Sequence, residues 1–221
     1  MMDVKVSGLL DLSKTIAAEL FDGIEYPWQA LDLISDFIKK LGPTLPKDEY
    51  DEIAPEVWVA KDATVFPSAY IKGPCIIDHG TEVRQCAFIR GSAIVGKNAV
   101  VGNSTELKNV VLFDNVQVPH YNYVGDSILG YKAHMGAGSI TSNVKSDKTL
   151  VVVKNGDEHI ETKRKKFGAI LGDNVEVGCN SVLNPGSVIG RGASIYPLSC
   201  VRGVVPAGHI YKSADNIVDR T

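Results

Sequence analysis

The chain lacks paired cysteines, long apolar runs and a strong net charge. Its four cysteines lie far apart without a C-x-x-C pair, which argues against a disulfide framework or a cysteine zinc site. No segment approaches the roughly 18 uninterrupted apolar residues of a membrane-spanning helix, and no secretory leader pattern is present. The net charge is only −3, so the bulk charge does not indicate nucleic acid as a partner. We therefore expect a cytoplasmic protein that binds neither membranes nor nucleic acid.

A regular repeat is the strongest signal that the sequence does contain. A branched aliphatic residue occupies every sixth position from Val59 to Leu107 and again from Leu171 to Val201. Such a hexapeptide repeat is typical of a parallel β-helix, because each strand and corner buries its aliphatic side chain only when neighbouring units stack on it. The sequence therefore predicts an all-β fold, with a β-helix domain over residues 59–221 and functional groups on the outside of a prism.

Residues 1–58 lie outside the repeat and predict a small α-helical N-terminal cap. Ser13 can begin one helix that runs to about Leu20, and Pro27 can begin a second over residues 28–41, which Gly42 would end. A β-helix exposes unpaired strand edges at its ends, so we expect this segment to cover the open end. A role in selecting a substrate or binding a partner is the alternative.

The repeat also stops at about residues 142–168. This stretch is polar and charged, and it includes the basic run from Lys163 to Lys166. Three valines at 151–153, followed by Asn155 and Gly156, predict a hairpin within it. Loops longer than about 15 residues inside compact folds are usually functional or disordered. We therefore expect a loop extruded from one corner of the β-helix.

Two cations are candidates for binding an anion. If three hexads form one coil, residues 18 apart stack at roughly the 4.8 Å spacing of neighbouring strands. Arg90 and Lys108 have this separation, and both directly follow an inward aliphatic residue, so both face outward on the same side. Two stacked cations are suited to a phosphate group. The alternative is that they are solvated charges on an outer face.

A histidine and two polar side chains fall near these cations. The register passes through five-residue steps at 107–112 and 124–129. Counted through these steps, Tyr123 and Asn143 approach the side that carries the two cations, while His120 stands on the adjoining face. A histidine can accept a proton at cytoplasmic pH. A surface histidine without a catalytic task is the alternative.

Three segments, in a fixed order, resemble a known family of enzymes. Residues 102–108, 118–126 and 135–143 are similar to the acetyltransferase half of the bacterial bifunctional glucosamine-1-phosphate acetyltransferase and N-acetylglucosamine-1-phosphate uridylyltransferase. The resemblance covers about residues 59–212. It implies a left-handed parallel β-helix, a homotrimer with active sites between subunits, and acetyl-CoA as the cosubstrate. The family's nucleotidyltransferase domain has no counterpart, because 58 residues cannot contain it.

The resemblance also implies roles for individual residues. Arg90 and Lys108 match the family's sugar-phosphate ligands, and His120 matches its general base. Tyr123 and Asn143 match substrate contacts. Lys166 resembles a lysine that reaches into the site of the neighbouring subunit, where it would contact the substrate phosphate.

The implied coenzyme contacts are less similar to the family. The candidate residues are Cys179, Pro197 and Lys212. The arginine expected to meet the coenzyme phosphate has no clear counterpart near the C terminus, and Lys212 is the candidate stand-in. Cys179 stands where the family has a serine near acetyl-CoA. His134 stands where the family has a substrate-binding asparagine, so the polarity of the pocket differs.

Together these features predict an acetyl-CoA-dependent N-acetyltransferase that acts on an amino-sugar phosphate. His120 would remove the proton that the amine sheds as it attacks the thioester, in a direct transfer. One alternative is a catalytically silent hexapeptide-repeat trimer that senses or scaffolds. Another is a metal-dependent enzyme of the carbonic anhydrase type, which needs three histidines at one zinc ion. The spacings of the five histidines place no close pair on one strand ladder.

Overall fold

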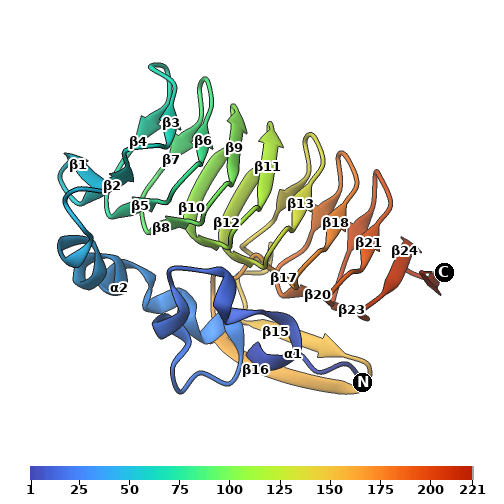
Figure 1. The fold of residues 1–221 in the computed structure, drawn as a ribbon. Helices are drawn as coiled ribbons and strands as arrows, with labels where there is room; N and C mark the ends of the chain where they lie inside the picture. Colours follow the sequence, from blue (N-terminus) through green and yellow to red (C-terminus); the bar gives the residue numbers. More distant parts are fainter. Residues whose placement is uncertain (221) are drawn as a thin grey trace.

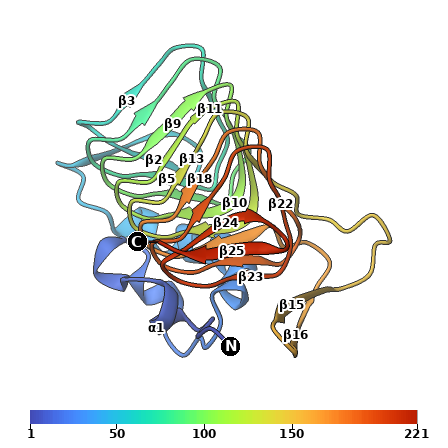
Figure 2. The ribbon, with the colours of Figure 1, turned by 90° about the vertical axis from the view of Figure 1, so that its right-hand side faces the viewer.

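The computed structural model describes residues 1–220, most of which wind into an elongated prism with three strands in each coil (Figure 1). Viewed along its axis, the prism has a triangular outline (Figure 2). Neighbouring coils pair in parallel, with Cys75 opposite Ala93 and Ile77 opposite Val95. The aliphatic side chain of nearly every hexad is fully buried inside. The predicted parallel β-helix of hexapeptide repeats is confirmed.

Three faces, named here face 1, face 2 and face 3, follow one another around each coil. Face 1 contains β2 (Val57–Ala60), β5 (Cys75–Ile77), β8 (Ala93–Val95), β17 (Ala169–Leu171), β20 (Ser187–Ile189) and β23 (Val204–Val205), with the later halves of β10 (Glu106–Leu112) and β12 (Tyr123–Leu129). Face 2 contains β3 (Thr64–Val65), β6 (Glu82–Val83), β9 (Val100–Asn103), β11 (Gln117–His120), β13 (His134–Met135), β18 (Glu176–Val177), β21 (Ser194–Ile195) and β24 (His209–Ser213).

Face 3 contains β4 (Tyr70–Ile71), β7 (Phe88–Ile89), the first halves of β10 and β12, β14 (Ile140–Thr141), β19 (Val182–Leu183) and β22 (Cys200–Val201). Two antiparallel strands flank the coils: β1 (Tyr50–Ala54) pairs with β2, and β25 (Asn216–Asp219) pairs with β24. Leu107 pairs with Val124, which is 17 residues away, as the count through the five-residue steps predicts.

The N-terminal segment is less helical than predicted. Its α-helices are α1 (Val6–Leu9) and α2 (Ile34–Leu41), and the remaining turns are the 3₁₀-helices η1 (Leu12–Lys14), η2 (Ala18–Phe21), η3 (Pro27–Asp32) and η4 (Gly42–Thr44). The predicted first helix is therefore replaced by short 3₁₀ turns. The predicted second helix is divided at Leu33 into η3 and α2.

The helical part of this segment, residues 1–44, lies along face 1, and β1 alone pairs with the free edge of the first coil, so the prediction that the segment covers the open end holds only for β1 (Figure 1). The Asp11 amide donates to Asp173, and the Lys14 carbonyl accepts from Asp114. The physical reason is an outward aliphatic column on face 1, whose members are Ile76, Ile94, Val111, Ile128, Ile170 and Val188. All six are fully buried. Burying each such side chain contributes about 1.5–3 kcal/mol, so the column favours a cover along face 1.

The segment between residues 142 and 168 leaves the prism at the corner between faces 3 and 1. It contains the predicted hairpin, formed by β15 (Val151–Asn155) and β16 (Glu158–Arg164). The hairpin folds back beside β23, and Val151 and Val153 are fully buried. Asn155 exchanges two hydrogen bonds with the backbone of Met2. The hairpin and the N-terminal segment thus cover face 1 together (Figure 2).

No helix within residues 1–220 has the length and apolar character needed to cross a membrane.

The cover on face 1 makes a prediction about stability. Ile94→Ala should lower the free energy of unfolding by about 2–5 kcal/mol, because it opens a cavity beneath α2 although the side chain points away from the prism interior. Leu33→Ala is the matched control, since Leu33 belongs to the N-terminal segment that covers Ile94 but is itself 47% exposed. Denaturant titration of both variants checks this. Equal losses would contradict a buried outer face.

Candidate functional site

The two predicted cations stand one coil apart on the edge between faces 3 and 1. The Arg90 amide donates to the Leu107 carbonyl, which places Arg90 beside Lys108. Each cation has a carboxylate partner: Arg90 Nη1 lies 2.8 Å from Glu106 Oε1, and Lys108 Nζ lies 2.9 Å from both oxygens of Asp126. The predicted pair is therefore present, but its charge is balanced.

Asp126 is the centre of this group, and the sequence reasoning missed it. Its side chain is 3% exposed and accepts hydrogen bonds from Lys108, from Asn109 Nδ2 at 3.0 Å and from Asn143 Nδ2 at 2.5 Å. Asn143 Nδ2 also lies 3.2 Å from the Tyr123 hydroxyl. The structure thus brings Lys108, Tyr123 and Asn143 together, as predicted. The available signal was a carboxylate two residues before the apolar strand end at Ile128 and Leu129.

Backbone hydrogen bonds from the insertion hold the main chain at Asp126 and Asn143 in place. Gly168 donates its amide to the Asp126 carbonyl, and Phe167 donates to the Asn143 carbonyl. Gly125 lies directly above Lys108 in the strand ladder. A Cβ atom at Gly125 would lie 2.5 Å from the Tyr123 hydroxyl, so a glycine is needed there. The residues that return the chain to the prism therefore build part of the site.

The surroundings also shift two pKa values. Desolvation, reinforced by the charges of Asp126 and Glu106, raises the pKa of Tyr123. Tyr123 consequently keeps its proton at neutral pH and can donate a hydrogen bond. The hydrogen bond to Glu106 raises the pKa of Arg90.

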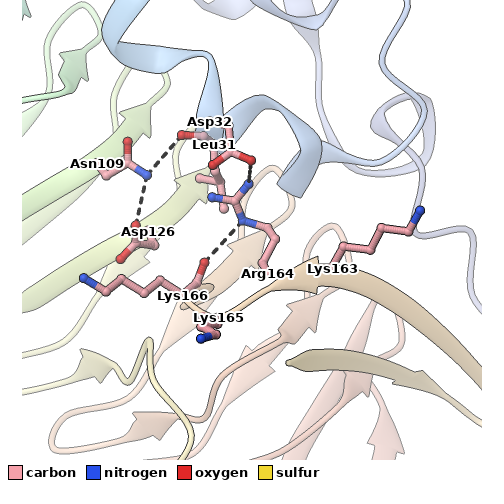
Figure 3. Close-up of a pocket in the computed structure, with 8 residues that line it drawn as sticks. All are labelled: Leu31, Asp32, Asn109, Asp126, Lys163, Arg164, Lys165 and Lys166. Carbon is pink, nitrogen blue, oxygen red and sulfur yellow. Dashed lines mark hydrogen bonds and ion pairs between the residues drawn. The ribbon is translucent and has the colours of Figure 1, made fainter. Parts of the chain in front are cut away.

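A pocket of about 400 Å³ adjoins Asp126, and we call it the basic pocket. It is lined by Leu31, Asp32, Asn109, Asp126, Lys163, Arg164, Lys165 and Lys166 (Figure 3). Arg164 pairs with Asp32 and donates to the Lys166 carbonyl at 3.2 Å. The predicted phosphate ligand Lys166 therefore lines a pocket together with Asp126 of its own chain. The N-terminal segment forms one wall, which the sequence did not reveal.

His120 stands at the opposite edge of face 3, at the corner with face 2. It is exposed, and within residues 1–220 its imidazole forms no hydrogen bond. Backbone hydrogen bonds between successive coils repeat at this corner and stack its residues on one another. The resulting column contains Asn103, His120, Ala137, Cys179 and Pro197. The predicted coenzyme residues Cys179 and Pro197 thus belong to the same column as His120, which we call the corner column.

Lys212 lies one coil beyond the far end of this column, in the adjoining row. Its neighbour Tyr211 pairs with Ile195, which places Lys212 one coil beyond Tyr196. The Lys212 ammonium lies 5.7 Å from the centre of the Tyr196 ring. His134 lies on face 2 and contacts Glu176 at 2.8 Å. In the part of the chain that the structure describes, no group of three His, Cys, Asp or Glu side chains is arranged to hold a metal ion.

Comparison with known proteins identifies relatives of this chain. The family model described as the GMPPB C-terminal domain matches residues 71–189. The bifunctional protein GlmU of Methanococcus maripaludis is 35% identical over 192 residues, which cover 85% of this chain and 46% of that protein. The bifunctional sugar-1-phosphate nucleotidylyltransferase/acetyltransferase of Sulfurisphaera tokodaii is 31% identical over 192 residues, covering 84% of this chain and 47% of that protein. The chain spans about half the length of these curated relatives.

Among solved structures, the hexapeptide transferase family protein from Anaplasma phagocytophilum superimposes with a TM-score of 0.42 at 17% identity. The superposition covers 75% of this chain and 80% of that chain.

The two ion pairs should differ in their effect on stability. Lys108→Met leaves the nearly buried Asp126 carboxylate without its cation and should lower the free energy of unfolding by about 3–5 kcal/mol. Arg90→Met should leave the stability unchanged, because the Arg90–Glu106 pair is solvated. Denaturant titration at neutral pH measures both. A stable Lys108→Met variant would show that Asp126 does not need its partner.

Proposed function

We propose that this protein transfers the acetyl group of acetyl-CoA to the amine of an amino-sugar phosphate. The chain belongs to the family described as the GMPPB C-terminal domain. The name of the Sulfurisphaera tokodaii relative contains two activities, nucleotidylyl transfer and acetyl transfer. Residues 1–220 contain no doubly wound α/β sheet of the kind that binds nucleotides for the first activity. The β-helix and its site are therefore assigned the second.

The corner column is the observation that carries this proposal. His120 stands at one end, small or short side chains follow at Ala137, Cys179 and Pro197, and a cation stands at Lys212. With neighbouring coils roughly 4.8 Å apart, the column from His120 to Lys212 is about 19 Å long. An extended acyl donor fits such a path, with its thioester at His120 and its phosphates near Lys212.

The acceptor would bind across face 3. Its phosphate would lie at the Arg90 and Lys108 edge, with Asp126 and Asn143 orienting Lys108 and Tyr123. His120 takes the proton that the amine loses as its nitrogen forms a bond to the thioester carbonyl carbon. The carbon–sulfur bond then breaks, and His120 passes this proton to the departing sulfur, so that coenzyme A leaves as the thiol and the histidine is again neutral. The protonated Tyr123 hydroxyl can donate to the developing oxyanion.

The transfer is direct in this proposal. The most plausible nucleophile for a covalent intermediate is Cys179, which lies two coils from His120. This separation is roughly 10 Å, too far for the imidazole to take the thiol proton. The acyl group therefore passes from donor to amine without an acyl-enzyme.

We also propose that the working form is a homotrimer that completes its sites between subunits. Face 3 supports this assignment, because it exposes Tyr70 and Phe88, whose rings lie 5.8 Å apart in the same row as Tyr123. Exposed aromatic side chains on a regular face are typical of a surface that binds another subunit.

Removing the proposed base should slow catalysis. His120→Ala should lower kcat by roughly 10²–10⁴, the usual contribution of a positioned base. Release of free thiol from acetyl-CoA with glucosamine 1-phosphate as acceptor measures the rate. His159→Ala is the control, since His159 lies on the exposed hairpin strand β16. An unchanged rate in His120→Ala would remove this residue from the mechanism, and no thiol release by the native protein with any amino-sugar phosphate would favour the silent scaffold.

Thiol protection tests the donor path without measuring catalysis. Cys86 and Cys179 are both exposed on the same corner of the prism, but Cys86 lies on the other side of His120. Coenzyme A should slow alkylation of Cys179 by N-ethylmaleimide and leave Cys86 unaffected. Peptide mapping by mass spectrometry gives both rates in one sample. Equal rates for Cys179 with and without coenzyme A would place the donor elsewhere.

A further inference from the structure

The charges around the site are unevenly neutralised. Arg90 pairs with Glu106, and Lys108 pairs with Asp126, so the face 3 edge has no net charge. In the basic pocket, Arg164 pairs with Asp32. The remaining cations of the pocket, Lys163, Lys165 and Lys166, have no carboxylate partner among residues 1–220. The excess positive charge therefore lies in the pocket and not at the predicted phosphate edge.

The pocket is a built feature, because contacts from three parts of the chain fix its walls. The Arg164 side chain is only 11% exposed and is held by Asp32 and by the Lys166 carbonyl. Asn109 donates to the Leu31 carbonyl at 3.1 Å and to Asp126 at 3.0 Å. The pocket is thus assembled from η3, the return strand β16 and strand β10 (Figure 3). Its volume falls within the range of about 300–1,000 Å³ for small-molecule sites.

The pocket also continues the proposed acceptor site. Asp126 and Asn109 line it, and Asp126 also binds Lys108. A ligand whose phosphate lies at Lys108 therefore has the pocket directly beyond that phosphate. Figure 3 shows the Lys166 side chain extending on the Asp126 side and the Lys163 side chain extending away from it. Lys166 is accordingly the cation that a second phosphate would meet beside Asp126, and Lys165, its neighbour in the chain, also lines the pocket.

We propose that the basic pocket binds the second phosphate of a diphosphate-linked amino sugar, such as a nucleoside-diphosphate sugar, which is then the acceptor instead of a sugar monophosphate. This inference rests on the proposed acetyl transfer. A diphosphate adds negative charge where the unpaired lysines lie, and lysine binds phosphate through charge-assisted hydrogen bonds. The group beyond the second phosphate would lie against Leu31, which gives the N-terminal segment a part in selecting the substrate.

Comparison of two acceptors tests the proposal. The native protein should acetylate UDP-glucosamine with a kcat/KM at least about tenfold above that for glucosamine 1-phosphate, as one added charge-assisted contact would give. Lys165→Ala should remove most of this preference and leave the kinetics with glucosamine 1-phosphate unchanged. Lys148→Ala is the matched control, because Lys148 is an exposed lysine of the same insertion outside the pocket. It should alter neither acceptor.

Each contrary result has a distinct meaning. A native preference for glucosamine 1-phosphate, or equal losses for both acceptors in Lys165→Ala, would overturn the diphosphate assignment and leave acetyl transfer standing. No acetylation of either acceptor would instead contradict the proposed function.

Binding measurements separate the pocket from catalysis. Titration calorimetry with UDP should detect binding that Lys165→Ala weakens about tenfold. Inorganic pyrophosphate that binds as tightly as UDP would assign recognition to the diphosphate, whereas weaker binding by pyrophosphate would add contacts with the nucleoside. Absence of UDP binding to the native protein would overturn the proposal whatever the acetylation result.

Discussion

The hydrogen-bonded stacking of coils is the constraint on which everything else in this molecule depends. It places residues 17 or 18 positions apart in direct register, so a row of side chains up the prism is a set of distant sequence positions. Arg90 and Lys108 form one such row at one edge of face 3, and His120, Cys179 and Pro197 form another at the opposite edge. The proposed site is therefore the strip of face 3 between these two rows, and its dimensions follow from strand spacing and not from loop conformations.

Face 1 differs from the other two faces because an outer layer covers it. Face 1 has apolar side chains on both of its sides, and the N-terminal segment and the hairpin supply the outer layer. Faces 2 and 3 and the corner between them remain accessible. The same cover contributes Leu31, Asp32 and the basic return strand to the pocket beside Asp126. Burial of the outer aliphatic column thus stabilises the fold and also builds one wall of the site.

Much of the fold and part of the site could be predicted from the sequence, because both follow from the six-residue period. Counting through the two short steps was sufficient to place Tyr123 and Asn143 beside Lys108. The support of the main chain at Asp126 and Asn143 was not predictable, because it comes from the backbone amides of Gly168 and Phe167, where the chain returns from the insertion. The inward aliphatic residue of each hexad does not predict the position of the N-terminal segment. The signal for that position is the outward aliphatic residue that precedes the inward one on face 1, as at Ile76 and Ile94.

The insertion leaves the prism after β14 and rejoins it at β17, yet Leu129 pairs with Leu171 as if the intervening chain were absent. A corner of the β-helix can therefore accommodate an insertion without breaking the hydrogen bonds between neighbouring coils. Such an insertion can differ in length and sequence while the stacked coils beneath it keep their shape.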